Sequence, residues 1–169
     1  MSLESMEDLL LEQLRSLYHA EKQIVAALPK LIVHTTCTAL RQTLADHLEE
    51  TERQVARLDR VFETLDHNPR GGRSRAAEGL IEDAAETVRR STRGGLMDAA
   101  IIASVQRIEH YEIAAYGCAI AFARELGLIP ISSVLTESLI EDKNLNDSLT
   151  RIAEEEVNGL AVNAGVVHR

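Results

Sequence analysis

The fold is decided by the stretch Met97–Leu126, MDAAIIASVQRIEHYEIAAYGCAIAFAREL, which carries the strongest helical pattern in the chain. Its apolar residues recur at alternating four- and three-residue intervals, which predicts one helix with a continuous apolar seam. The seam positions are Ile101, Val105, Ile108, Glu112, Ala115, Ala119, Phe122 and Leu126. A carboxylate buried without a partner costs on the order of several kcal/mol. Glu112 therefore requires a compensating group in the core.

The first predicted helix repeats this anomaly. Its seam keeps the same alternation and also has one glutamate in the middle: Leu10, Leu14, Leu17, Glu21, Ile24, Leu28 and Leu31. Two separate helices are therefore each expected to bury a single carboxylate.

Turn-forming residues between the periodic segments predict five helices, with a bend at Pro29 in the first. The expected ranges are 5–34, 38–66, 76–90, 96–125 and 132–156. The 169 residues suit one domain, which we place at residues 1–157 as an all-α helical bundle. Residues 158–169 mix Gly, Asn and Val without a period and are expected to form a flexible C-terminal tail.

The spacing of four glutamates suggests that one helical hairpin is used twice. Glu21 and Glu49 are equidistant from the turn near residue 35, and Glu112 and Glu141 are equidistant from the turn near residues 126–127. Residues equidistant from the turn of an antiparallel hairpin lie at the same height, here roughly 20 Å from the turn. Two packed hairpins would bring all four glutamates together at mid-height. Glu52 and Glu109 would lie one turn away on their helices.

Four ionised carboxylates in one core repel each other strongly, and two divalent metal ions carry the opposite charge. Oxygen-rich sites of this kind suit iron, with manganese as the alternative. The candidate metal ligands are Glu21, Glu49, Glu52, Glu109, Glu112 and Glu141. The alternative for Glu21 and Glu112 is a salt bridge to a nearby base, such as Lys22 or Arg107.

Overall composition narrows the possible partners and location. The net charge of −9 and the pI near 5.1 argue against binding nucleic acid or an anionic membrane, and they favour cations. Cys37 and Cys118 have no metal-ligand spacing and are expected to be small helix-packing residues. No apolar run reaches the roughly 20 residues of a membrane span, so a cytoplasmic protein is expected.

The chain resembles the YciE/YciF stress-protein family of the ferritin-like superfamily. Five segments carry the resemblance: AEKQ at 20–23, HLEET at 47–51, EGLIEDA at 78–84, EHYEIAAYG at 109–117 and ESLIEDK at 137–143. It implies a ferritin-like four-helix bundle of two antiparallel hairpins with an extra helix in the crossover. It also implies a homodimer and a link to bacterial stress responses.

The chain departs from the usual ferritin-like ligand pattern. Dinuclear sites of that kind take a Glu-x-x-His motif from each of two helices. Carried over to this chain, the resemblance places Glu49 and Glu141 at the motif glutamates, and Glu52 and Asn144 at the histidines. The nitrogen ligands are thus replaced, which bears on metal affinity and redox tuning.

Several residues near the predicted site could have either a structural or a functional role. His47 and His110 lie at helix flanks, where a hydrogen-bonded structural histidine is the more common case. Tyr18, Tyr111 and Tyr116 fit either core packing or a hydrogen bond to a ligand carboxylate. For the whole chain, three functions remain open: oxidation of Fe(II) or removal of peroxide, a non-catalytic stress protein stabilised by metal, and a helical scaffold without metal.

Overall fold

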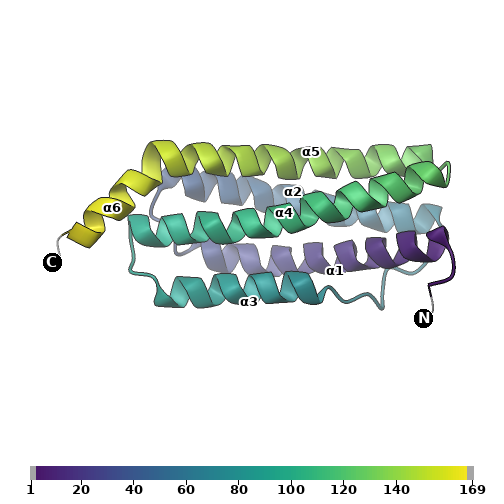
Figure 1. Cartoon of the computed structure of the whole chain (residues 1–169), viewed down its shortest axis with the longest axis horizontal. Coiled ribbons are helices and arrows are strands. Elements are labelled where there is room, and N and C mark those ends of the chain that lie inside the picture. The colour runs from purple at the N-terminus through teal and green to yellow at the C-terminus, as the bar shows by residue number, and fades with distance from the viewer. Residues whose placement is uncertain (1–2, 167–169) are drawn as a thin grey trace.

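Every regular element in the described part of the chain is a helix, as predicted. The structure is a computed structural model that describes residues 3–166, with side chains described for residues 3–163 (Figure 1). The elements are α1 (Met6–Ile32), α2 (Thr38–Thr64), α3 (Arg75–Arg90), α4 (Gly95–Glu125), α5 (Ile129–Ile152), the π-helical turn η1 (Ala153–Val157) and α6 (Asn158–Val166). None of the helices in residues 3–166 has the length and hydropathy needed to cross a membrane.

The four long helices form a bundle of two hairpins. α1 packs against α2 and α4 packs against α5, while α1–α4 and α2–α5 contacts join the two hairpins. α3 lies in the crossover, as the resemblance implies, and it packs against α1 and α4 (Figure 1). The bundle thus places one face of each long helix against a common core.

The helix ends follow local sequence signals. Ser5 and Asp8 form a reciprocal capping box at the start of α1. α1 runs through Pro29 without a break and ends at Ile32. Gly127 follows α4 with a φ of 70°, a left-handed conformation that favours glycine. α5 begins at Ile129, three residues earlier than predicted, because proline fits the first turn of a helix.

The start of α2 is capped by a side chain from another helix. Cys37 at its N-cap makes no side-chain capping bond. Instead, the buried carboxylate of Asp98 in α4 accepts hydrogen bonds from the backbone N–H groups of Thr36 and Cys37, at 2.8 and 2.9 Å. The Thr36 hydroxyl donates a third bond to Asp98, at 2.5 Å. This contact ties the α1–α2 turn to the beginning of the second hairpin.

The predicted irregular C-terminal tail is helical in its described part. η1 continues α5 with Val157 buried in the core, and α6 packs against the start of α4. A Cβ atom added to Gly95 would lie 2.9 Å from atoms of Leu160 and Ala161, which shows how closely the two helices approach. The sequence of α6 carries no apolar period, and none of its residues with described side chains is buried, so the pattern could not reveal this helix. Residues 167–169 of the predicted tail lie outside the described residues.

The apolar core is divided into two clusters. One contains Leu10, Leu14, Leu17, Phe62 and Tyr116, and the other contains Ile24, Leu28, Leu44, Ile101 and Leu149, among others. Glu21 lies in sequence between the α1 residues of the two clusters and is itself buried. A buried polar layer therefore interrupts the core at mid-height. This layer holds the side chains that could bind a metal ion or take part in a reaction.

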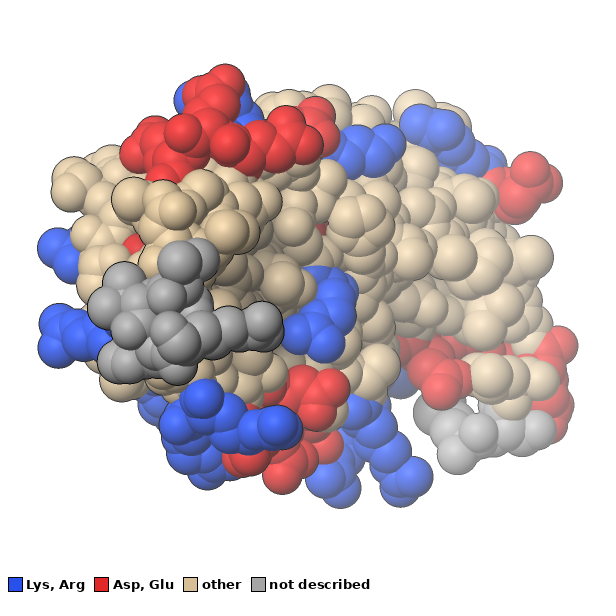
Figure 2. All heavy atoms as spheres, turned by 60° about the vertical axis from the view of Figure 1, so that its left-hand side comes forward, with Lys and Arg blue, Asp and Glu red and all other residues tan. Residues whose placement is uncertain are grey.

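Charged side chains on the face shown in Figure 2 are mixed in sign. Lys and Arg lie among Asp, Glu and uncharged residues on this face. Inside the bundle, by contrast, several carboxylates are enclosed.

Candidate metal centre

Each long helix contributes at least one polar side chain to the buried layer. α1 supplies Glu21, α2 supplies His47, α4 supplies Glu109 and Glu112, and α5 supplies Asp142. The four carboxylates have relative exposures of 0%, and His47 is only 2% exposed. Full burial distinguishes these groups from the many acidic side chains at the surface.

The helical period explains why these residues face the core. In α2 the buried positions are spaced alternately by four and three residues: Leu40, Leu44, His47, Thr51, Gln54, Leu58 and Val61. In α5 the same alternation gives Leu135, Ser138, Asp142, Leu145, Leu149 and Ile152. The polar residues occupy seam positions of regular helices, and no local distortion is needed to bury them.

Three of the carboxylates converge closely. Glu109, Glu112 and Asp142 each offer one oxygen, and these oxygens all lie within 4.8 Å of one another. Nε2 of His47 lies 3.3 Å from Oε1 of Glu109. The Tyr116 hydroxyl donates a hydrogen bond to Oε1 of Glu21. The group thus contains acidic oxygens, one imidazole nitrogen and a phenol at its edge.

Most of the carboxylate oxygens have no hydrogen-bond partner within the described part of the chain. They are Glu21 Oε2, Glu109 Oε1 and Oε2, Glu112 Oε1 and Oε2, and Asp142 Oδ2. A buried polar group left unsatisfied costs about 1–3 kcal/mol, and more if it is charged. Among the described residues, no lysine or arginine forms an ion pair with any of the four carboxylates. These six oxygens therefore need protons or a bound cation to satisfy them.

The enclosed charges shift the ionisation of the cluster. Burial, followed by the charge of Asp142, raises the pKa of Glu21 well above its usual range, and burial followed by Glu21 does the same for Glu112. Burial and then Glu109 raise the pKa of Asp142 to about 8. These carboxyl groups hold protons at neutral pH unless a cation replaces them.

The pKa of His47 depends on two opposing effects, burial and the charge of neighbouring carboxylates. Burial alone would lower its pKa, but the carboxylates of Glu109, Asp142 and Glu50 together outweigh burial and raise it. Nδ1 of His47 lies 4.0 Å from Oε2 of Glu50, which is half-buried. Nε2 therefore faces the cluster while Nδ1 faces a second carboxylate, an arrangement that suits a ligating histidine.

The structure brings together Glu21, Glu109 and Glu112 as predicted, but it does not place the other three candidates with them. Glu49 and Glu52 are exposed on α2. Glu141 accepts two hydrogen bonds from the guanidinium of Arg57, at 2.5 and 2.7 Å. The predicted core positions of Glu49, Glu52 and Glu141 are wrong because the seams of α2 and α5 pass one or two residues away from them.

Within the buried layer, Asp142, Thr51 and Gln54 are given no role in the sequence analysis. For His47 a structural role is favoured there over metal ligation. The strict four-three alternation through Leu40, Leu44 and Leu58 would have found the α2 residues. Hairpin symmetry pointed to Glu141, which is the sequence neighbour of the buried Asp142. A one-residue error turns a helix by about 100°, which separates a surface position from a core position.

Comparison with known proteins places the chain in a family. Residues 5–161 match the family described as a domain of unknown function (DUF892). Protein YciF of Escherichia coli strain K12 is 39% identical over 165 residues, a stretch that covers 96% of this chain and 99% of YciF.

Solved structures agree with this relationship. The crystal structure of the E. coli stress protein YciF has a TM-score of 0.87 at 40% identity, covering 92% of this chain and 99% of that chain. YcfI of Rhodopseudomonas palustris, provisionally named a structural protein, has a TM-score of 0.86 at 48% identity, covering 88% of this chain and 95% of that chain. A Xanthomonas campestris protein with 18% identity and a TM-score of 0.70, covering 89% of this chain and 92% of that chain, shares the fold alone. The chain therefore belongs to the DUF892 family, together with the E. coli stress protein YciF.

Proposed function

We propose that this chain is a metal-binding stress protein whose buried carboxylates hold two iron or manganese ions. The observation that carries the proposal is the set of six buried carboxylate oxygens without hydrogen-bond partners in the described chain. The relationship to the E. coli stress protein YciF supports the stress-related role.

The residues present fit divalent cations of this class. Glu21, Glu109, Glu112 and Asp142 carry four negative charges when ionised, which two divalent ions balance. Carboxylate oxygens suit manganese and iron, and the imidazole of His47 adds a nitrogen ligand acceptable to iron. When bound, iron or manganese would supply redox chemistry, namely oxidation of Fe(II) or removal of peroxide.

The protein side chains would contribute ligation, orientation and exclusion of water. Tyr116 holds one oxygen of Glu21 by its hydroxyl and leaves the other oxygen free. The apolar clusters above and below the layer keep bulk water from the carboxylates. A dry, preorganised site of this kind strengthens electrostatic interactions with a bound cation.

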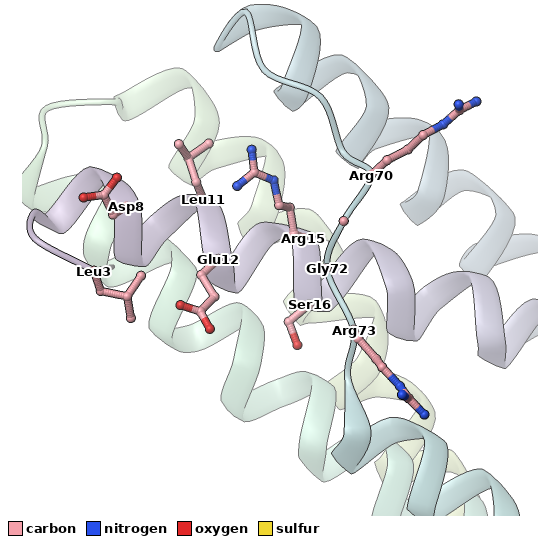
Figure 3. A pocket seen from close by; sticks show the side chains of 10 residues that line it. Leu3, Asp8, Leu11, Glu12, Arg15, Ser16, Arg70, Gly72 and Arg73 are labelled. Atoms are coloured by element: carbon pink, nitrogen blue, oxygen red, sulfur yellow. The ribbon is translucent and has the colours of Figure 1, made fainter. Parts of the chain in front are cut away.

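A non-catalytic structural role is the second candidate, and the burial of the site favours it. A cavity of about 500 Å³ lies between the first turns of α1 and the loop before α3 (Figure 3). Its lining includes Arg15, Arg70 and Gly72 and none of the buried carboxylates. A cation held in the core without access for a substrate would stabilise the fold instead of turning over. The name given to YcfI of R. palustris agrees with this alternative.

The deciding experiment is elemental analysis of protein purified without chelator. We expect about two iron or manganese ions per chain by the charge argument, with loss of metal in Glu112→Gln. Glu49→Gln is the matched control, because Glu49 is exposed on α2 and should leave the metal content unchanged. Equal metal content in Glu112→Gln and wild type would refute the proposed site, as would absence of metal in both after incubation with Fe(II) or Mn(II).

Catalysis is tested separately from binding. Peroxide-dependent or oxygen-dependent oxidation of Fe(II) that disappears in Glu112→Gln supports an enzyme. A metal-dependent rise in melting temperature without turnover supports the structural role. The homodimer stays a prediction, which light scattering of the purified protein tests.

A further inference from the structure

Gln54 is a buried polar residue that α2 places beside the carboxylates. Its side chain is fully enclosed, and Nε2 lies 2.8 Å from Oδ1 of Asp142 and 3.1 Å from Oε2 of Glu141. The backbone carbonyl of Ser138 lies 3.5 Å from the same nitrogen. All three neighbours are acceptors, so the amide nitrogen must face them. The opposite orientation would set Oε1 of Gln54 against two carboxylates.

This orientation leaves the amide oxygen free. Within the described residues, Oε1 of Gln54 has no hydrogen-bond partner although it is buried. The same side chain donates a hydrogen bond to Asp142. The carboxylate of Asp142 converges with those of Glu109 and Glu112. A neutral amide oxygen is an established kind of ligand for hard divalent cations. Its burial next to the convergent carboxylates is the second observation that points to a cation.

Arg57 keeps the amide in place. It lies one turn beyond Gln54 on α2 and binds both oxygens of Glu141, which is one of the acceptors of the Gln54 amide. Arg57 neutralises Glu141 outside the cluster, while Gln54 holds Asp142 by Oδ1 and leaves Oδ2 without a partner. Of the two adjacent acidic residues, Glu141 thus forms a partly buried ion pair with Arg57, and Asp142 is held by Gln54 in the core.

Building on the proposed function, we propose that Gln54 is a specificity-determining residue of the metal site. Its carboxamide oxygen is a neutral ligand, and its amide N–H group positions Asp142 for the same cation. An oxygen donor at this position favours manganese or ferrous iron, whereas a nitrogen donor would favour zinc. The single imidazole of His47 then leaves the site dominated by oxygen.

The test compares Gln54→Met and Gln54→His with the wild-type chain. Metal is removed with chelator, Mn²⁺ binding is followed by electron paramagnetic resonance, and Zn²⁺ is added in competition. Gln54→Met should weaken Mn²⁺ binding by about 10- to 100-fold. Gln54→His should shift the preference toward Zn²⁺ by about tenfold or more.

The same substitutions at Gln106 are the matched control. Gln106 also bridges two helices, through Asn146 and Thr150, but its hydrogen bonds lie outside the carboxylate layer. Both Gln106 variants should keep the wild-type Mn²⁺ affinity and spectrum. A structural effect of losing an interhelical amide would lower the melting temperature of either set without changing the Mn²⁺ signal.

The outcomes separate this inference from the proposed function. Wild-type chain that binds neither Mn²⁺ nor Fe²⁺ overturns both. Wild-type chain that binds Mn²⁺, with the same affinity and spectrum in Gln54→Met, overturns the role of Gln54 alone. If circular dichroism shows that Gln54→Met is unfolded, Gln54→Glu replaces it. That variant retains an oxygen ligand and should keep the preference for Mn²⁺ over Zn²⁺, and loss of that preference overturns the inference.

Discussion

Replacing Asp142 by asparagine should have opposite effects on the metal-free and metal-loaded protein. In the metal-free chain, burial and then Glu109 raise the pKa of Asp142 from 3.8 to about 8. At pH 7 the folded chain therefore holds a proton that the unfolded chain has released. Because the unfolded state binds fewer protons, the free energy of unfolding falls as pH rises from about 4 to about 8.

The size of this effect follows from the two pKa values. Each pKa unit corresponds to about 1.4 kcal/mol, so keeping Asp142 protonated up to pH 7 costs on the order of 4 kcal/mol. Asparagine has no proton to lose, and its side-chain oxygen can still accept the hydrogen bond from Gln54. Asp142→Asn should therefore stabilise the metal-free protein at pH 7 by up to about 4 kcal/mol, a rise in melting temperature of roughly 10 °C.

The assay is urea unfolding followed by circular dichroism, in chelator, between pH 4 and pH 8. The gain in Asp142→Asn should be largest at pH 8 and absent at pH 4. Asp147→Asn is the control, because Asp147 is exposed on the same helix and should change little. In saturating Mn²⁺ or Fe²⁺ the sign should reverse, since the variant loses a ligand. A metal-free variant that is less stable than wild type at pH 7, or equally stabilised at pH 4, would refute this account of the core.

Four further substitutions, two of which form a glycine pair, test how the bundle is held together, each by urea unfolding. Asp98→Ala removes three hydrogen bonds at the start of α2 and should cost about 2–4 kcal/mol; a loss below about 0.5 kcal/mol would show that water replaces the cap. Arg57→Met leaves the partly buried Glu141 carboxylate without its guanidinium and should cost roughly 2 kcal/mol, largely independent of salt, whereas a strongly salt-dependent loss would mark an ordinary surface pair. Gly72→Ala would set a Cβ 2.5 Å from α1 and should destabilise by more than about 1 kcal/mol, while Gly117→Ala meets nothing within 4 Å and should stabilise by about 0.5–1 kcal/mol. The reverse order would contradict the close approach at Gly72.

The sequence was sufficient to predict the helices and the pairing of hairpins, because a four-three apolar pattern survives single polar interruptions. Glu21 and Glu112 were found by the same pattern, since each interrupts an otherwise apolar seam. The α2 and α5 contributions were harder. In α2 three consecutive seam positions, from His47 to Gln54, are polar, so only the register set by Leu40, Leu44 and Leu58 on either side identifies them. In α5 two acidic residues are adjacent, and the seam through Leu135, Leu145 and Leu149 selects Asp142, while Arg57 of α2 pairs with Glu141.

The apolar pattern of a single helix does not show which side chains of two different helices form hydrogen bonds. The amide of Gln54 and the hydroxyl of Tyr116 each meet a carboxylate from another helix, and the residues joined are 88 and 95 positions apart in the sequence. Such contacts depend on the rotation and height of two packed helices.

The cap that Asp98 provides has a consequence for folding order. The α1–α2 hairpin looks like a repeated, self-contained unit, yet the first turn of its second helix is completed by a residue about 60 positions later in the chain. A growing or truncated chain that lacks α4 therefore lacks this cap, and the first turn of its α2 should fray. Because the cap joins the two hairpins, the bundle should unfold in one cooperative transition despite its two-fold internal resemblance.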